Sequence, residues 1–182
     1  SEYLTALHNH TLPVLLNTEK VEKGDCFFIP AGTVHAICKV CYIAEIQQTS
    51  DITYRIYDYD RRDKNGNPRE LHTELATDVI NFCEQKQHSI HYHQHENHTE
   101  ELVSCNYFTT NYLKFDKEVE KDYIELDSFV IYMCLEGNFT LVYDVDKTVK
   151  VNKGETILVP AILKNLFLIP ETEAEILEIY IR

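Results

Sequence analysis

Glycine and proline are scarce in this sequence, and no apolar run approaches the length of a membrane-spanning helix. The 182 residues include only 5 Gly and 5 Pro, whereas 44% are hydrophobic, with 12 Tyr and 8 Phe. This composition excludes a disordered or low-complexity chain and is typical of a globular protein rich in strand formers. The first ten residues have neither the basic nor the apolar region of a secretory signal, and we expect no membrane partner.

Basic side chains are also few. Lys and Arg total 17 against 30 Asp and Glu, which gives a formal net charge of -13 at pH 7. Such a chain repels nucleic-acid backbones and anionic membrane surfaces, so we expect neither as a partner. Any bound phosphate must therefore be held by a few local cations.

The six cysteines do not indicate a disulfide framework. Cys26, Cys83 and Cys134 lie inside apolar runs, as small buried residues do in a reducing compartment. Cys38 and Cys41 form a single CxxC without a second pair, so we expect no metal or redox role for them. These patterns predict a cytoplasmic protein.

The sequence contains a weak internal repeat. VEKGDCFFIPAGTVHAI at 21–37 matches VNKGETILVPAILKNLF at 151–167, a shift of 130 residues. Each copy reads as a Lys-Gly turn, a short apolar strand, and a proline that stops the strand and starts a bend. The repeat predicts two related β units in one chain.

Further strand-like runs surround the two copies, at 40–49, 112–115, 128–134, 139–144 and 174–181. Short strands separated by turn signals at this spacing indicate a sandwich or a barrel. Between the copies, the apolar spacing of 69–83 predicts a connecting helix. We expect shorter helices over 2–8 and from a Thr11 cap through Leu16.

The first copy carries the pattern Gly-x5-Pro-x-Gly-x2-His, formed by Gly24, Pro30, Gly32 and His35. It resembles the second motif of the cupins, in which the histidine is a metal ligand inside a small β barrel. Gly32 permits the backbone turn, and a neutral imidazole suits zinc or a similar ion. The alternative is a structural histidine at the start of a strand.

The following segment, AEIQQTSDITYRIYDYDR at 44–61, resembles the signature of type I phosphomannose isomerases. The resemblance covers the first half of the chain well and the second half only by architecture. It implies a mainly β fold with two cupin-like jelly-roll units, the first incomplete, joined by a helix-containing connector. The implied parts are 1–60 for the C-terminal part of the catalytic cupin, 61–104 for the connector and 105–182 for a second, metal-free cupin.

The resemblance also implies roles for single residues. His35 would be a zinc ligand, Glu45, Asp51 and Arg55 would be catalytic, and Gln47 and Arg55 would bind the substrate. Glu45 and Gln47 share one face of the expected strand, which is either a barrel interior or a solvent face. Arg55 is a planar cation suited to a phosphate or an enediolate oxygen. Asp51 is either a general acid and base or an ordinary turn residue.

The implied activity is a zinc-assisted interconversion of mannose 6-phosphate and fructose 6-phosphate through an enediol. The family's metal site also needs a Gln-x-His pair and a glutamate upstream, and no such pair precedes His35. One imidazole does not define a zinc site. We therefore expect this chain to be part of a longer enzyme and inactive alone. The second copy has Ile162 and Asn165 at the glycine and histidine positions, so we expect a structural cupin there.

Two other interpretations stay open at this point. The chain could be a non-enzymatic sugar-binding or sensor cupin. An iron-dependent cupin oxygenase is disfavoured, because the chain lacks a facial carboxylate pattern. In each case the exposed edges of an incomplete barrel favour self-association, and we expect a homodimer through exposed strand edges.

The segment HSIHYHQHENH at 88–98 holds five of the nine histidines. His91, His93 and His95 alternate, so they would project from one face of a strand and could chelate an ion. The segment has no glycine or proline turn to fix ligand geometry. For this reason the sequence favours a polar linker over a physiological metal site.

Overall fold

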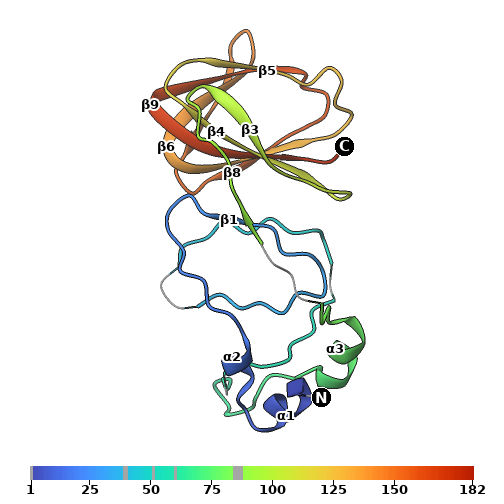
Figure 1. Ribbon diagram of the computed structural model, residues 1–182. Helices are drawn as coiled ribbons and strands as arrows, with labels where there is room; N and C mark the ends of the chain where they lie inside the picture. The colour runs from blue at the N-terminus through green and yellow to red at the C-terminus, as the bar shows by residue number, and fades with distance from the viewer. Residues whose placement is uncertain (1, 39–40, 51, 60, 84–87) are drawn as a thin grey trace. The chain divides into compact units, whose positions relative to one another are not determined.

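The computed structural model describes residues 2–38, 41–50, 52–59, 61–83 and 88–182. They divide into two compact units, Ser1–Ser89 and Ile90–Arg182, both drawn in Figure 1. Many more of the described residues lie in strands than in helices, and every strand pair of the larger sheet is antiparallel. The prediction of a mainly β chain is confirmed.

Seven strands of the second unit form one sheet, ordered β3-β4-β9-β6-β7, with β5 paired to β9 and β8 to β6. Figure 1 shows these strands curving around a common interior. The two longest strands, β6 and β9, pair along most of their length and so join the other strands into one body. The strands are β3 (His98–Ser104), β4 (Thr109–Phe115), β5 (Val119–Asp122), β6 (Val130–Asp144), β7 (Lys147–Asn152), β8 (Thr156–Val159) and β9 (Asn165–Tyr180).

Alternating apolar side chains of these strands fill the interior. In β4 the residues Leu113 and Phe115 point inward and are fully buried. The rings of Phe115 and Tyr132 both meet Phe139 edge to face, with centroid distances of 5.8 Å and 6.4 Å, an arrangement that aromatic pairs prefer. The core continues through aliphatic residues of β9, including Leu166, Leu168 and Ile176.

The first unit has little regular structure. It contains α1 (Glu2–His8), α2 (Leu12–Leu15), α3 (Thr73–Val79) and β1 (Cys26–Phe27), which pairs with β2 (Ser89–Ile90). The helix predicted over 2–8 is found, and the one predicted over 69–83 is shorter. Thr11 precedes α2 without capping it, because its hydroxyl donates to the Ala6 carbonyl oxygen at 3.3 Å. No helix within the described ranges is long and apolar enough to cross a membrane.

The strand predicted over 40–49 is not observed in its described residues, 41–49. Nearly all of these side chains are exposed, Ile46 being the half-buried exception. A strand needs a neighbouring strand to accept its backbone hydrogen bonds. In the described part of the first unit, β1 and β2 form the only ladder between named strands.

The internal repeat is visible in the backbone. The Asp25 N–H donates to the Glu22 carbonyl oxygen at 3.1 Å, and 130 residues later the Glu155 N–H donates to that of Asn152 at 3.0 Å. The strands that follow, β1 and β8, begin at Cys26 and Thr156, again 130 residues apart. The two copies therefore share a turn and the strand that leaves it.

Candidate functional site

A second shared turn carries the cupin-like motif. The Thr33 N–H donates to the Pro30 carbonyl oxygen at 3.2 Å, and the Leu163 N–H donates to that of Pro160 at 3.0 Å. In the first copy Gly32 has φ of 83°, as the third position of a type II turn requires. The turn that the motif predicts is present, two residues before His35.

This turn is docked on the end of α3. The Asn81 N–H donates to the Gly32 carbonyl oxygen at 2.9 Å. A Cβ added at Gly32 would lie 2.6 Å from the Val79 carbonyl oxygen, well inside van der Waals contact. Glycine is therefore required here both by its backbone conformation and by the close approach of α3.

The segment around Arg55 is fixed near the other end of α3. The Arg55 N–H donates to His72 Nδ1 at 3.1 Å, and the His72 N–H donates to the Arg55 carbonyl oxygen at 2.7 Å. Because Nδ1 accepts a hydrogen bond, a neutral His72 carries its proton on Nε2. The Arg55 guanidinium also donates from Nη1 to the Glu70 carbonyl oxygen at 3.3 Å.

An ion pair between Asp58 and Arg69 also joins the segment around Arg55 to the residues that precede α3. Arg69 Nε donates to one Asp58 oxygen at 2.7 Å, and Nη2 contacts the other oxygen. The hydrogen bond from Arg69 holds the pKa of Asp58 below its ordinary value. Asp58 is therefore an ionised partner of Arg69, in the bidentate geometry that guanidinium and carboxylate prefer, and its role is to position the segment.

The predicted site residues are not joined by any hydrogen bond in the described part of the chain. His35 is exposed, with Nδ1 2.9 Å from the Thr33 carbonyl oxygen, so its other nitrogen is the one available to a ligand. Glu45 and Gln47 are exposed, and Arg55 is half-buried. The turn before His35 and the Arg55 segment attach to opposite ends of α3, which is roughly 10 Å long. Asp51 lies outside the described residues.

The described residues do not fit a zinc ion at His35. As their side chains stand, they contain no group of three or more His, Cys, Asp or Glu that could hold a metal. His35 contributes one imidazole nitrogen, whereas zinc in proteins takes three or four protein ligands. A zinc ion at His35 would need ligands from other parts of a protein.

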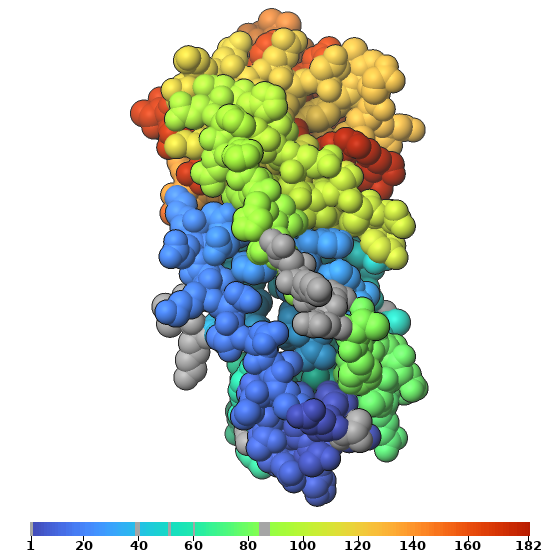
Figure 2. All heavy atoms as spheres, viewed as in Figure 1, coloured from blue at the N-terminus to red at the C-terminus, as the bar shows by residue number. Residues whose placement is uncertain are grey.

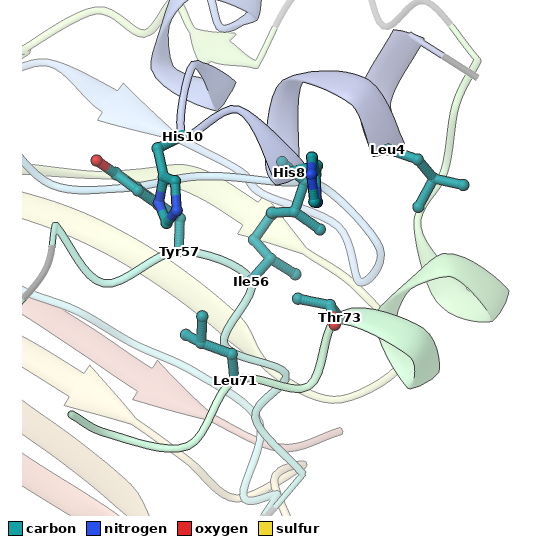
Figure 3. A pocket seen from close by; sticks show the side chains of 8 residues that line it. Leu4, His8, His10, Ile56, Tyr57, Leu71 and Thr73 are labelled. Carbon is teal, nitrogen blue, oxygen red and sulfur yellow. The ribbon is translucent and has the colours of Figure 1, made fainter. Parts of the chain in front are cut away.

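A cavity of about 320 Å³ lies beside the Arg55 segment, and Figure 3 shows the side chains around it. None of the predicted site residues lines it, and its lining holds no Lys or Arg. Its mostly apolar wall does not suit a sugar phosphate. The lining consists of Leu4, Leu7, His8 and His10 from the N-terminal segment and Ile56, Tyr57, Leu71 and Thr73.

The second unit holds a buried polar network that we did not predict from the sequence. Glu178 accepts hydrogen bonds from Lys121 Nζ at 2.9 Å and Asn111 Nδ2 at 2.7 Å, and contacts the Tyr123 hydroxyl. Lys121 also donates to the Thr99 hydroxyl at 2.8 Å. The run AEILEIYI contained the signal, because alternation places Glu178 on the apolar face of β9.

Curated relatives of this chain are isomerases. No family model matches it. The mannose-6-phosphate isomerase ManA of Bacillus subtilis (strain 168) is 34% identical over 161 residues, which cover 87% of this chain and 50% of that protein. The mannose-6-phosphate isomerase of Streptococcus mutans serotype c is 52% identical over 66 residues, 36% of this chain and 21% of that protein.

A solved structure shows the same relationship. The crystal structure of a mannose 6-phosphate isomerase from Bacillus subtilis matches with a TM-score of 0.58 and 31% identity, over 72% of this chain and 41% of that one. This likeness, with the antiparallel sheet of the second unit, confirms the predicted cupin fold class. The chain spans about half the length of the curated relatives that it matches over most of its own length.

Proposed function

We propose that this chain is part of an enzyme that interconverts mannose 6-phosphate and fructose 6-phosphate, because it is related to the mannose-6-phosphate isomerases over most of its length. The observation that carries this proposal is the 34% identity over 161 residues with a protein of that name. A match of this length includes residues of both units, so it reflects more than one shared motif.

Arg55 is the group we assign to the substrate's negative charge. Residues 55–69 contain five basic side chains and three acidic ones, within a chain whose net charge is -13. Asp58, which would otherwise compete for Arg55, is paired with Arg69. A guanidinium has five N–H donors, and among the described contacts Arg55 uses one of them. Its fork geometry suits a phosphate or a developing enediolate oxygen.

The remaining groups would handle the sugar. Isomerisation of an aldose to a ketose moves a proton between neighbouring carbons, which requires a general base such as the carboxylate of Glu45. Gln47 would hydrogen-bond a sugar hydroxyl, and Asp51 would exchange protons with the sugar oxygens. We assign no step to a zinc ion, because His35 alone does not make a zinc site.

An isomerase assay tests the proposal. The conversion of mannose 6-phosphate to fructose 6-phosphate is measured for the protein expressed from its complete gene and for the 182-residue chain. We expect turnover by the first and none by the second. Failure of the complete gene product to isomerise would contradict the proposed function, and its binding of the sugar without turnover would favour a sensor cupin. Turnover by the 182-residue chain would contradict the need for further ligands.

The role of Arg55 is tested in the active protein. Arg55→Lys retains the charge but loses the planar fork, so we expect a higher KM for mannose 6-phosphate. The matched control is Arg62→Lys, because Arg62 is an exposed arginine that donates to the Gly66 carbonyl oxygen. Equal KM values for the two variants would remove Arg55 from the substrate site.

A further inference from the structure

The main chain of Arg55 is held by the backbone and the ring of one residue, His72. The His72 N–H donates to the Arg55 carbonyl oxygen at 2.7 Å, and the Arg55 N–H donates to His72 Nδ1 at 3.1 Å. Two hydrogen bonds between the same two residues fix both the position and the orientation of this main chain. The first involves backbone groups alone, whereas the second depends on the protonation state of an imidazole ring.

The position of His72 is in turn fixed by α3. His72 directly precedes this helix, and its carbonyl oxygen accepts from the N–H of Ala76, a buried residue, at 2.9 Å. The ring of Tyr54 lies beside the imidazole, with the two centroids 6.0 Å apart. The ring that accepts from Arg55 is therefore supported both by a helix and by a neighbouring aromatic side chain.

His88 offers a direct contrast to His72. Its Nδ1 lies 3.3 Å from the Phe28 carbonyl oxygen, and the Phe28 N–H donates to the His88 carbonyl oxygen at 2.9 Å. A carbonyl oxygen only accepts, so Nδ1 of His88 is the donor and keeps this contact when the ring is protonated. At His72 the partner is an N–H, and an imidazolium has no nitrogen left to accept it. Protonation therefore removes the contact to Arg55 but not the contact to Phe28.

The charges around His72 do not compensate an imidazolium. Asp58 and Arg69 pair with each other. Among the described residues, no carboxylate forms an ion pair with the His72 ring. The other titratable groups on the segments packed together here are Tyr54, Tyr57, Glu70, Glu74, His8 and His10. Because His8 and His10 also titrate near neutral pH, a test of His72 must compare variants at each pH.

The hydrogen bond from Arg55 to the His72 ring bears on how Arg55 binds an anion. Among the described contacts, the guanidinium itself makes only one hydrogen bond, to the Glu70 carbonyl oxygen at 3.3 Å. Ordering a long side chain when a ligand binds costs free energy. A guanidinium whose main chain is already held needs less ordering, so neutral His72 favours anion binding by Arg55.

We propose that His72 is a positioning residue for Arg55: neutral His72 holds Arg55 in place for the sugar phosphate, and protonated His72 releases it. The inference rests on the proposed role of Arg55 in substrate binding. Imidazoles change charge between about pH 5 and 8, so affinity for the substrate should fall as the pH decreases through this range. In Figure 2 the part of the first unit that contains α3, coloured green, lies at the visible surface, and His72 is half-buried, so protons reach the ring without unfolding.

The pH dependence of KM for mannose 6-phosphate tests the inference in the protein expressed from its complete gene. His72→Leu fills a similar volume but has no acceptor. At about pH 8 its KM should be about fivefold above that of the wild type, the effect of one lost hydrogen bond, with kcat little changed. At about pH 5.5 the two KM values should converge, because the wild-type ring is then protonated as well.

The ratio of the two KM values is the quantity to compare. It cancels the titration of the substrate phosphate, whose second pKa is about 6, and that of His8 and His10, which both proteins contain. The matched control is His88→Leu, because His88 is also half-buried but its Nδ1 donates. The ratio for this control should not change with pH.

A second measurement needs neither activity nor a variant of His72. In the same protein labelled with ¹⁵N-arginine, the NMR resonance of the Arg55 backbone amide should shift between about pH 5 and 8. The resonance is identified by its loss in Arg55→Lys. In His72→Leu the shift should be absent, while a dispersed spectrum shows that this variant is folded.

The possible failures can be told apart. A KM ratio that does not vary with pH, or an Arg55 amide that does not titrate, overturns the inference about His72 while the role of Arg55 stands. If the protein has no turnover, or if Arg55→Lys has the KM of the wild type, the proposed function fails. An amide that titrates in that case would show that the contact exists without serving the substrate, which also overturns the inference.

Discussion

Lys121 Nζ lies 2.9 Å from Glu178 Oε1 in the interior of the second unit, where the two side chains are 9% and 3% exposed. Thr99 and Asn111 take up further hydrogen bonds of this pair. The four residues belong to β5, β9, β3 and β4, so one polar network links four strands. Because it satisfies its members only in one register, the network makes alternative strand pairings unfavourable.

Removing one member of this buried pair should destabilise the second unit. Lys121→Met leaves the Glu178 carboxylate buried without its cation, and we expect a loss of about 3–5 kcal/mol in the free energy of unfolding. Denaturant titration measures it. The control, Lys147→Met, removes an exposed ion pair with Asp144 and should change stability little. Similar midpoints for the two variants would show that the buried pair does not stabilise the fold.

The Glu178 carboxylate should also make the free energy of unfolding depend on pH. Burial by itself raises the pKa of Glu178, but the charge of Lys121 and the hydrogen bonds of Asn111 and Tyr123 outweigh it, so the pKa lies below the ordinary 4.5. A depressed folded-state pKa adds stability above the unfolded value, and this stability is lost as pH falls through the folded value. The difference in melting temperature between wild type and Glu178→Gln should therefore shrink from about pH 5 to about pH 3. A difference that stays constant over this range would contradict it.

Gly32 and Gly66 form a matched pair for testing the turn beneath His35. Their φ values are 83° and 85°, but a Cβ at Gly66 would have no atom within 4 Å, whereas one at Gly32 meets the Val79 carbonyl oxygen. Gly66→Ala should lower the free energy of unfolding by only about 1–2 kcal/mol, the cost of a left-handed backbone conformation for a residue with a Cβ. Gly32→Ala should lower it by more, as measured by chemical denaturation. If both lose the same amount, the turn is not docked tightly on α3.

The ion pair between Asp58 and Arg69 should protect the backbone amides of residues 52–58 from hydrogen exchange. Arg69→Lys retains the charge but loses the bidentate hydrogen bond, so these amides should exchange faster. Mass spectrometry of deuterium uptake in peptides from this region measures the effect. Arg62→Lys, which alters an arginine bound to the Gly66 carbonyl oxygen, is the control. Unchanged uptake in Arg69→Lys would mean that other contacts hold the segment.

Sequence patterns predicted the apolar strands of the second unit but not its polar ones. Runs at 112–115 and 174–181 lie within β4 and β9 or extend one residue past them. The runs at 128–134 and 139–144 were predicted as separate strands. They form one strand, β6, because β9 pairs with both halves across two bulges. The polar strands β3 and β5 lack the apolar alternation on which such predictions depend, and in β7 it is limited to Val149 and Val151.

At the candidate site, the sequence predicted the local turn but not the contacts between residues far apart in the chain. The turn at Gly32 follows from its own few residues. Its docking on α3 and the reciprocal hydrogen bonds of Arg55 and His72 join residues far apart in sequence, and no local pattern encodes them. The positive φ of 61° at Asn97 did have a signal in the sequence, since asparagine tolerates positive φ better than most residues.

The turns common to the two copies bear on ancestry. Residues 22–25 and 152–155 keep the same backbone hydrogen bond, although Ile162 and Asn165 stand where the first copy has Gly32 and His35. Main-chain bonds make few demands on side-chain identity, so after a gene duplication one copy is free to shed its reactive groups while selection still preserves its scaffold. The two positions that differ are then the natural places to introduce the glycine and the histidine of the first copy into the second.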